Sequence, residues 1–154
     1  MATNTHAARC ESGDAWLASC SLRPNLVRDV WDMDGLAPIH TGTHWLAAEA
    51  RLDAAMSVLR DLPRTRRGPL LADPMIGAAW WLVPLDAAEQ LADVRALTVH
   101  PPDWPLHCPP TGWPVCGRVW LDRPDGSGRL TNPATLGAVF GPGRGPRLPA
   151  EAFG

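Results

Sequence analysis

The chain has 154 residues, a length typical of one domain. Its 14 basic residues are all arginine, and its 16 acidic residues leave a formal net charge of −2, which excludes the strong, non-specific binding of nucleic acid that needs a basic surface. No apolar run approaches the roughly 18 residues of a membrane span, and the first residues lack the apolar segment of a secretory signal. We therefore expect a cytoplasmic protein.

The beginning of the chain is predicted to be helical after a loose start. Residues 1–12 are polar, and we expect them to be flexible. A first short helix is predicted from Ser12 to about Cys20. A second is predicted from Leu26 to Trp31, where apolar residues recur at helical spacing and Asn25 can cap the helix.

The segment 43–62 allows two interpretations. It follows a predicted short strand at 37–40 and a turn at Thr41-Gly42-Thr43. Its content of Ala, Glu, Arg, Leu and Met favours one long helix. The alternative is a strand at 43–48 that leads into a helix from about 50 to 62. Composition alone leaves both interpretations open.

The rest of the chain alternates short apolar runs with turns. Two of these runs flank Pro74 and predict a β-hairpin. A helix is predicted over 86–93, where Asp86 and Glu89 approximate a capping box. The last helix is predicted over 133–140, with Asn132 or Thr131 as its cap and proline at its first position. Residues 101–114 are rich in proline and predict a loop. The strands of this region are predicted at 69–74, 77–83, 96–99 and 115–121.

The order of these elements predicts one α+β or α/β domain over residues 13–140. We expect a small mixed or antiparallel sheet with about three to five helices. Residues 141–154 are rich in glycine and proline, and we expect them to form a disordered tail.

Three acidic residues are candidates for a catalytic metal site. Asp32 and Asp34 are two residues apart, so on a strand their carboxylates would face the same way and could hold a divalent ion for phosphoryl transfer. They follow a predicted helix and precede Gly35, so a solvated helix end is the alternative. Glu49 is the third candidate.

A second group has the residue types that bind zinc. His100, His107, Cys108 and Cys116 lie in the proline-rich segment and the strand after it. The group contains no Cys-x-x-Cys pair, and the adjacent His107 and Cys108 are badly spaced for one ion. Free thiols and surface imidazoles are therefore the favoured interpretation. We expect no cofactor, with zinc or magnesium as the alternative.

Two further sets are candidate binding residues. Arg64, Arg66 and Arg67 form the one local basic cluster, which suits a phosphate or an acidic partner, although a solvated loop after a helix is the alternative. Trp104 and Trp113 lie in the proline-rich segment and are expected to be exposed. Exposed tryptophans can stack on bases or contact a partner protein.

Several short motifs also occur, in the same order, in small proteins of high-GC bacteria. They are Ala15-Trp16-Leu17-Ala18-Ser19, Trp31 before Ala37-Pro38-Ile39, Gly68-Pro69-Leu70-Leu71-Ala72-Asp73, Trp80-Trp81-Leu82-Val83-Pro84 and Val119-Trp120-Leu121. On these motifs the chain resembles the bifunctional DNA primase/polymerase-like (prim-pol) proteins of the archaeo-eukaryotic primase class. The resemblance covers most of residues 14–140 and implies a strand, rather than a helix, at 43–48.

The resemblance also implies a function. Active members of the class carry two carboxylates on the strand after the Thr-Gly turn and a histidine later, whereas this strand offers Glu49 alone. We therefore expect a catalytically inactive prim-pol-like domain that acts as a binding, regulatory or accessory protein, with a protein partner. One alternative is a metal-dependent enzyme acting on nucleic acid or a nucleotide through Asp32, Asp34 and Glu49. The other is a small cytoplasmic enzyme with zinc at His100, His107, Cys108 and Cys116.

Overall fold

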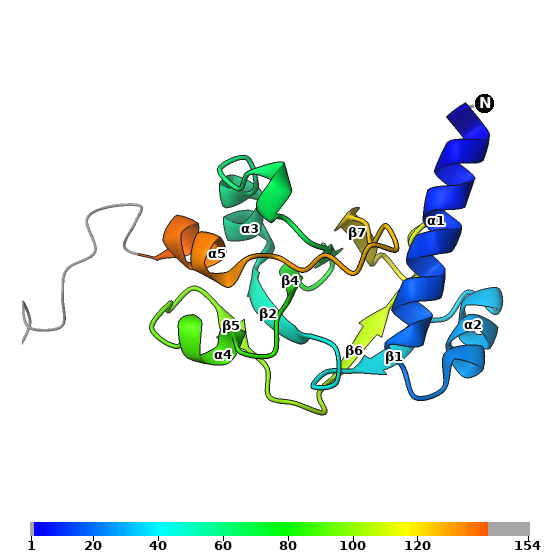
Figure 1. The fold of residues 1–154 in the computed structure, drawn as a ribbon, viewed down its shortest axis with the longest axis horizontal. Coiled ribbons are helices and arrows are strands. Elements are labelled where there is room, and N and C mark those ends of the chain that lie inside the picture. The colour runs from blue at the N-terminus through cyan, green and yellow to red at the C-terminus, as the bar shows by residue number, and fades with distance from the viewer. Residues whose placement is uncertain (1, 142–154) are drawn as a thin grey trace, which may run out of the picture.

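The chain builds its main sheet around a hairpin of β3 (Leu70–Asp73) and β4 (Ala78–Val83). A computed structural model describes residues 2–141, with side chains from residue 6 onward (Figure 1). Five antiparallel strands form this sheet in the order β5-β2-β4-β3-β7. The other three strands are β2 (Leu46–Arg51), β5 (Thr98–Val99) and β7 (Val119–Asp122).

A second, two-stranded sheet pairs β1 (Ala37–His40) with β6 (Pro105–Cys108). The helices α1 (Ala2–Ser19) and α2 (Pro24–Asp32) lie beside this small sheet (Figure 1). The remaining helices lie toward the opposite end of the molecule in the same view. They are α3 (Leu52–Leu59), the short 3-10 helix η1 (Arg64–Arg66), α4 (Ala87–Gln90) and α5 (Pro133–Phe140).

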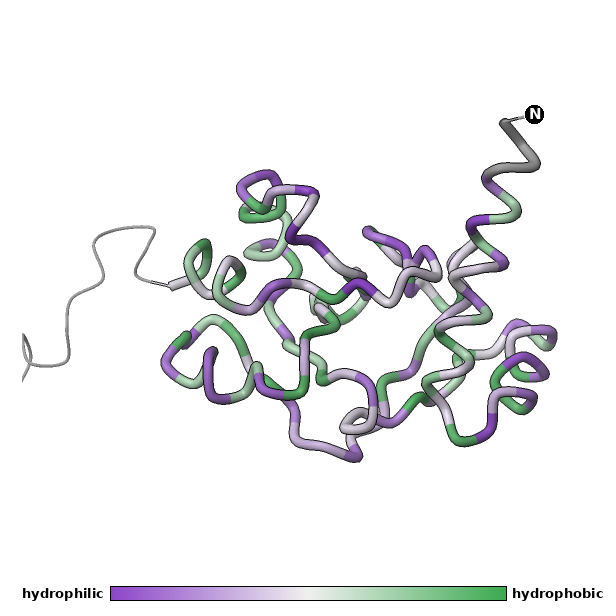
Figure 2. Tube along the Cα trace, in the orientation of Figure 1, coloured by the Kyte–Doolittle hydropathy of each residue, from purple (hydrophilic) through white to green (hydrophobic). Residues whose placement is uncertain are grey.

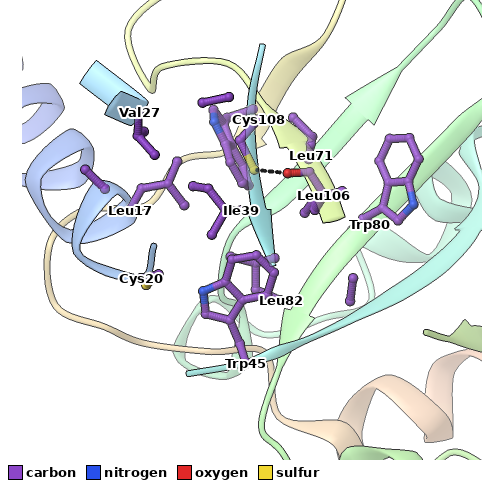
Figure 3. Packing of buried hydrophobic residues seen from close by; sticks show 14 of the residues in the cluster. Leu17, Cys20, Val27, Ile39, Trp45, Leu71, Trp80, Leu82, Leu106 and Cys108 are labelled. Atoms are coloured by element: carbon purple, nitrogen blue, oxygen red, sulfur yellow. Dashed lines mark hydrogen bonds between the residues drawn. The ribbon is translucent and has the colours of Figure 1, made fainter. Parts of the chain in front are cut away.

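The main sheet has a hydrophobic core on each face. Alternate residues of a strand point to opposite faces, so Trp80 and Leu82 of β4 enter one core while Trp81 and Val83 enter the other. The first core contains residues of α1, α2 and the small sheet (Figure 3). The second contains residues of α3, α4 and α5. Because both faces of β4 are covered, all of its residues are buried.

These elements confirm the predicted α+β class, with one domain, five α-helices and antiparallel sheets. The predicted hairpin is present, and Asp73 lies opposite Ala78 at its closed end. The predicted cap of the last helix is also present, since Asn132 Oδ1 accepts a hydrogen bond of 3.0 Å from the backbone N–H of Thr135.

The segment 43–62 folds as a strand followed by a helix. β2 pairs with β4 along its whole length, from Leu46 opposite Val83 to Arg51 opposite Ala78. The helix α3 begins at Leu52 and ends at Leu59. Backbone pairing with a neighbouring strand therefore overrides the helical propensity of the alanines in β2.

The first helix differs from its prediction. It begins at Ala2, well before the predicted start at Ser12. The polar sequence of this segment has no apolar periodicity, which is why the sequence predicted a loose start; Figure 2 shows hydrophilic and hydrophobic residues mixed along α1. Tertiary contacts hold the helix instead. Thr111 donates to the carbonyl of Cys10 and to Asp14 Oδ1, and Glu11 pairs with Arg28 at 2.9 Å.

The prediction of a loop throughout 101–114 was wrong in part. Residues 105–108 form β6, which pairs antiparallel with β1. Proline is tolerated here because Pro105 is the first residue of a strand that has β1 as its one partner in the described sheets. The predicted strand at 115–121 is shorter, since β7 begins at Val119.

Two other features of the sequence bear on the extent of the fold. Among the described residues, no helix is both long enough and apolar enough to cross a membrane. Residues 142–154 of the predicted glycine- and proline-rich tail lie outside the described part of the chain.

Candidate functional site

The structure does not gather the three candidate acids into one metal site. Asp32 and Asp34 are exposed at the end of α2, and Asp34 has a φ of 58° in the turn that follows. Glu49 belongs to β2 and faces the first core. Within residues 6–141, no three His, Cys, Asp or Glu side chains lie where they could hold a metal ion together. Asp32 ends α2 and Asp34 lies in the turn after it, so their carboxylates do not share a strand face.

The predicted zinc group is also dispersed. Cys108 is fully buried in β6, its thiol donates to the carbonyl of Leu106, and burial raises the pKa of this thiol far above its ordinary value (Figure 3). His107 is exposed, because neighbouring residues of a strand point to opposite sides. Cys116 is exposed in a turn with a φ of 51°. His100 lies within hydrogen-bond distance of Glu49.

Glu49 is the centre of a polar contact on the main sheet. Its Oε1 accepts a hydrogen bond of 2.7 Å from Trp80 Nε1, and His100 Nε2 lies 2.9 Å from the same oxygen. The register makes the first contact possible, since Glu49 lies opposite Trp80. His100 follows β5, which lies next to β2, and its ring stacks on Trp104 with a centroid distance of 3.7 Å.

Arg118 contacts the ring of Trp80 and forms further polar contacts with both sheets. The guanidinium of Arg118 lies over the Trp80 ring, 4.5 Å from its centroid, and donates from Nε to Asp73 Oδ2 at 2.9 Å. Arg118 Nη1 also donates to the carbonyl of His107 at 2.8 Å. Because Asp73 belongs to β3 and His107 to β6, Arg118 connects the main sheet to the small sheet. The arginine and the carboxylate are both mostly buried.

The two tryptophans predicted to be exposed have different environments. Trp104 is half-buried by its stacking on His100 and by contact with the first core. Trp113 is 51% exposed. Within the described structure, Trp113 is therefore the more accessible of the pair.

Arginines from two distant segments meet around a pocket of about 350 Å³. Arg64 is the first residue of η1, and Arg67 directly follows this short helix. Arg123 and Arg129 flank the turn that follows β7. The other lining residues are Trp16 of α1, Gly68, Pro69, Asp122, Pro124, Asp125 and Gly128. The third arginine of the predicted cluster, Arg66, is exposed and does not line this pocket.

Arg67 has a structural role at the base of this arginine pocket. Its Nε donates to the carbonyl of Leu62 at 2.8 Å, and its Nη2 donates to the carbonyl of Leu59 at 2.6 Å. These carbonyls lie at or just after the C-terminal end of α3, where backbone acceptors lack helical partners. The two bonds hold the guanidinium in place, whereas Arg64, Arg123 and Arg129 are exposed.

The turn after β7 sets the positions of Arg123 and Arg129. Asp125 accepts hydrogen bonds from the backbone and hydroxyl of Ser127, and these bonds lower the pKa of the Asp125 carboxyl. Gly128 has a φ of 77°, and a β-carbon there would lie 3.2 Å from the Trp16 indole nitrogen. A glycine is therefore required where the turn approaches Trp16.

Asp122 is an acid of the arginine pocket with a buried carboxylate oxygen. Its Oδ2 is buried and has no hydrogen-bond partner among the described residues. Burial raises the pKa of its carboxyl, while the charges of Arg67 and Arg64 act in the opposite direction. With Asp125, the pocket is lined by four arginines and two carboxylates, so its charge is positive although the whole chain is negative.

Sequence reasoning found Arg64 and Arg67 but missed the rest of this pocket. Arg123, Arg129 and Trp16 are far from them along the chain, and no local motif connects the three segments. One signal was present, namely two arginines flanking the turn-forming run Asp-Gly-Ser-Gly at 125–128. Comparison of the chain with protein-family models, curated proteins and solved structures finds no match.

Proposed function

We propose that this chain is a binding protein whose arginine pocket holds a small phosphate-bearing ligand of the nucleotide class. The observation that carries this proposal is the convergence of Arg64, Arg67, Arg123 and Arg129 on one pocket. A guanidinium presents a fork of donors that matches the oxygens of a phosphate. Three of these arginines are exposed, so they can reach an entering anion.

The size and lining of the pocket favour a nucleotide over a bare phosphate. A volume of about 350 Å³ lies within the range of small-molecule sites, which begins at about 300 Å³. Trp16 supplies an aromatic surface in the same pocket, and aromatic side chains stack on nucleobases. Arginine on one part of the wall and an indole on another suit a ligand that has both a phosphate and a flat ring.

The contacts of Glu49 support binding rather than polymerisation. The resemblance to prim-pol proteins implies two carboxylates on the strand that contains Glu49. The structure places alanines at neighbouring positions of β2, and the oxygen of Glu49 is shared by Trp80 and His100. Two-metal chemistry requires several free carboxylate oxygens. A catalytically inactive prim-pol-like domain therefore remains our proposal for the evolutionary origin of the chain.

The proposal is tested by titrating the purified protein with ATP, GTP and inorganic phosphate in a calorimeter. We expect nucleotide binding that weakens with rising salt and is at least tenfold tighter than phosphate binding. The variant Arg129→Gln should lose about tenfold in affinity, which corresponds to about 1.4 kcal/mol. Arg95→Gln removes the same charge from an exposed position that does not line the pocket, and it should bind as the native chain does.

Two results would overturn this proposal. One is the absence of nucleotide binding at millimolar concentration. The other is an equal loss in Arg129→Gln and Arg95→Gln, which would show that net charge alone attracts the ligand. Binding that requires Mg²⁺ or Mn²⁺ and is lost in Glu49→Gln would instead support the metal-dependent enzyme.

A further inference from the structure

The helix α2 is apolar on two sides, and the structure covers one of them. Val27 and Trp31 are buried in the first core. Leu26 is 51% exposed and Met33, directly after the helix, is 83% exposed. Residues three and four apart lie on the same face of a helix, so Leu26, Val30 and Met33 form one stripe, in which Val30 is half-buried and also packs against the first core. We call this stripe the outer face of α2.

The outer face borders a hollow in the surface. A pocket of about 520 Å³ lies between α2 and β1, with Leu26, Val30 and Pro38 among its lining residues. Leu22, which precedes the helix, also lines it and is 96% exposed. None of the residues that line this pocket lines the arginine pocket. An apolar face beside a hollow is typical of a surface that packs against another protein.

The charges at the two ends of α2 indicate that the partner is a second copy of this chain. Arg23 precedes the helix and Asp34 follows it, both are exposed, and neither forms an ion pair within the described structure. When two such helices pack antiparallel, Arg23 of each copy lies near Asp34 of the other. The pairing forms two opposite-charge contacts and sets the two helix dipoles antiparallel. The same surface is therefore complementary to itself, as a twofold interface requires.

We propose that two copies of this chain associate through the outer faces of α2, packed antiparallel about a twofold axis. Leu26 of each copy lies against Val30 of the partner subunit, and the exposed side chains of one copy fill the hollow beside α2 of the other. Arg23 pairs with Asp34 of the partner subunit. This association does not depend on the arginine pocket or its ligand.

Sedimentation equilibrium of the full chain across micromolar concentrations tests the association. The native chain should form dimers, and Leu26→Glu should be monomeric throughout because it places two carboxylates in an apolar interface. Leu85→Glu is the matched control, since Leu85 is 49% exposed and lies outside the pocket beside α2. It should dimerise as the native chain does. Circular dichroism melting of each variant confirms that it is folded.

A charge exchange tests the antiparallel arrangement. Arg23→Asp alone and Asp34→Arg alone each bring like charges together twice in a homodimer, so each variant should dimerise at least tenfold more weakly. An equimolar mixture of the two variants restores opposite charges at both contacts and should recover dimerisation. A native chain that stays monomeric, a dimeric Leu26→Glu, or a mixture no tighter than its components would overturn the proposal. Monomers that bind a different protein through α2 would give the first of these results.

Discussion

At the scale of single residues, two acids have unusual environments, Asp122 in the arginine pocket and Glu49 on the main sheet. Asp122 has a buried oxygen without a partner among the described residues, and Glu49 shares one oxygen between Trp80 and His100. Burial without a hydrogen bond costs free energy, whereas a shared hydrogen bond restrains a side chain. The burial of Asp122 therefore lowers the stability of the fold, whereas the contacts of Glu49 restrain its side chain.

Because the pKa of Asp122 is raised in the folded state, we expect the stability of the fold to depend on pH. An acid whose pKa is higher in the folded state stabilises the fold when protonated, so its contribution is full below the unfolded-state pKa of about 4 and is lost as the pH rises through the folded-state pKa. Asp122→Asn should remove this loss and be more stable than the native chain at pH 7. Thermal melts between pH 4 and 7 measure the effect, and an unchanged difference across that range would contradict it.

At the scale of elements, contacts between distant segments decide how far a helix extends. In α1, Cys10 and Asp14 accept hydrogen bonds from Thr111, and Gly13 lies against the turn after β7. A β-carbon at Gly13 would clash with the carbonyl oxygen of Pro124. The helix and the turn that bears Arg123 therefore pack too closely to admit a side chain at Gly13.

Gly13→Ala tests this close packing. Alanine favours a helix over glycine by about 1 kcal/mol, so propensity alone predicts stabilisation. The clash with a backbone carbonyl should reverse the sign and destabilise the fold by about 1–3 kcal/mol, in the range of overpacked sites. Urea denaturation measures the change. Ser12→Ala, at the neighbouring exposed position of α1, should lie within about 0.5 kcal/mol of the native chain.

Buried contacts of Asp14 provide a second test of α1. Asp14 Oδ1 accepts from the backbone N–H of Thr111 at 2.7 Å and from its hydroxyl at 2.8 Å. Asp14→Ala leaves a buried N–H unpaired, so we expect a loss of about 1–3 kcal/mol. Urea denaturation of this variant should also show greater destabilisation than Asp29→Ala, which alters an exposed acid of α2. Equal stability of the two variants would show that α1 does not need this contact.

At the scale of the whole molecule, Arg118 connects the two sheets through polar contacts. Arg118 bonds Asp73 in the main sheet and the carbonyl of His107 in the small sheet, and it lies over the Trp80 ring. An arginine in this position supplies several donors in a fixed plane, which is why one side chain can serve both sheets.

Arg118→Met should destabilise the fold by about 2–4 kcal/mol, because it leaves Asp73 mostly buried without its cation. Asp73 keeps its hydrogen bond from the backbone N–H of Met75, which limits the loss. The double variant Arg118→Met with Asp73→Asn removes the unpaired charge and should recover part of the stability. Denaturant titrations of both variants measure the coupling, and simple additivity would show that the ion pair contributes little.

The sequence by itself determined the features that depend on local patterns. The hairpin of β3 and β4, the cap and proline of α5 and the α+β class follow from apolar runs, turn residues and capping residues that are adjacent in the chain. Tertiary structure decided the features that depend on contacts between distant residues. The length of α1, the strand β6 and the meeting of Arg64 with Arg123 and Arg129 arise from such contacts, and no pattern within one segment records them.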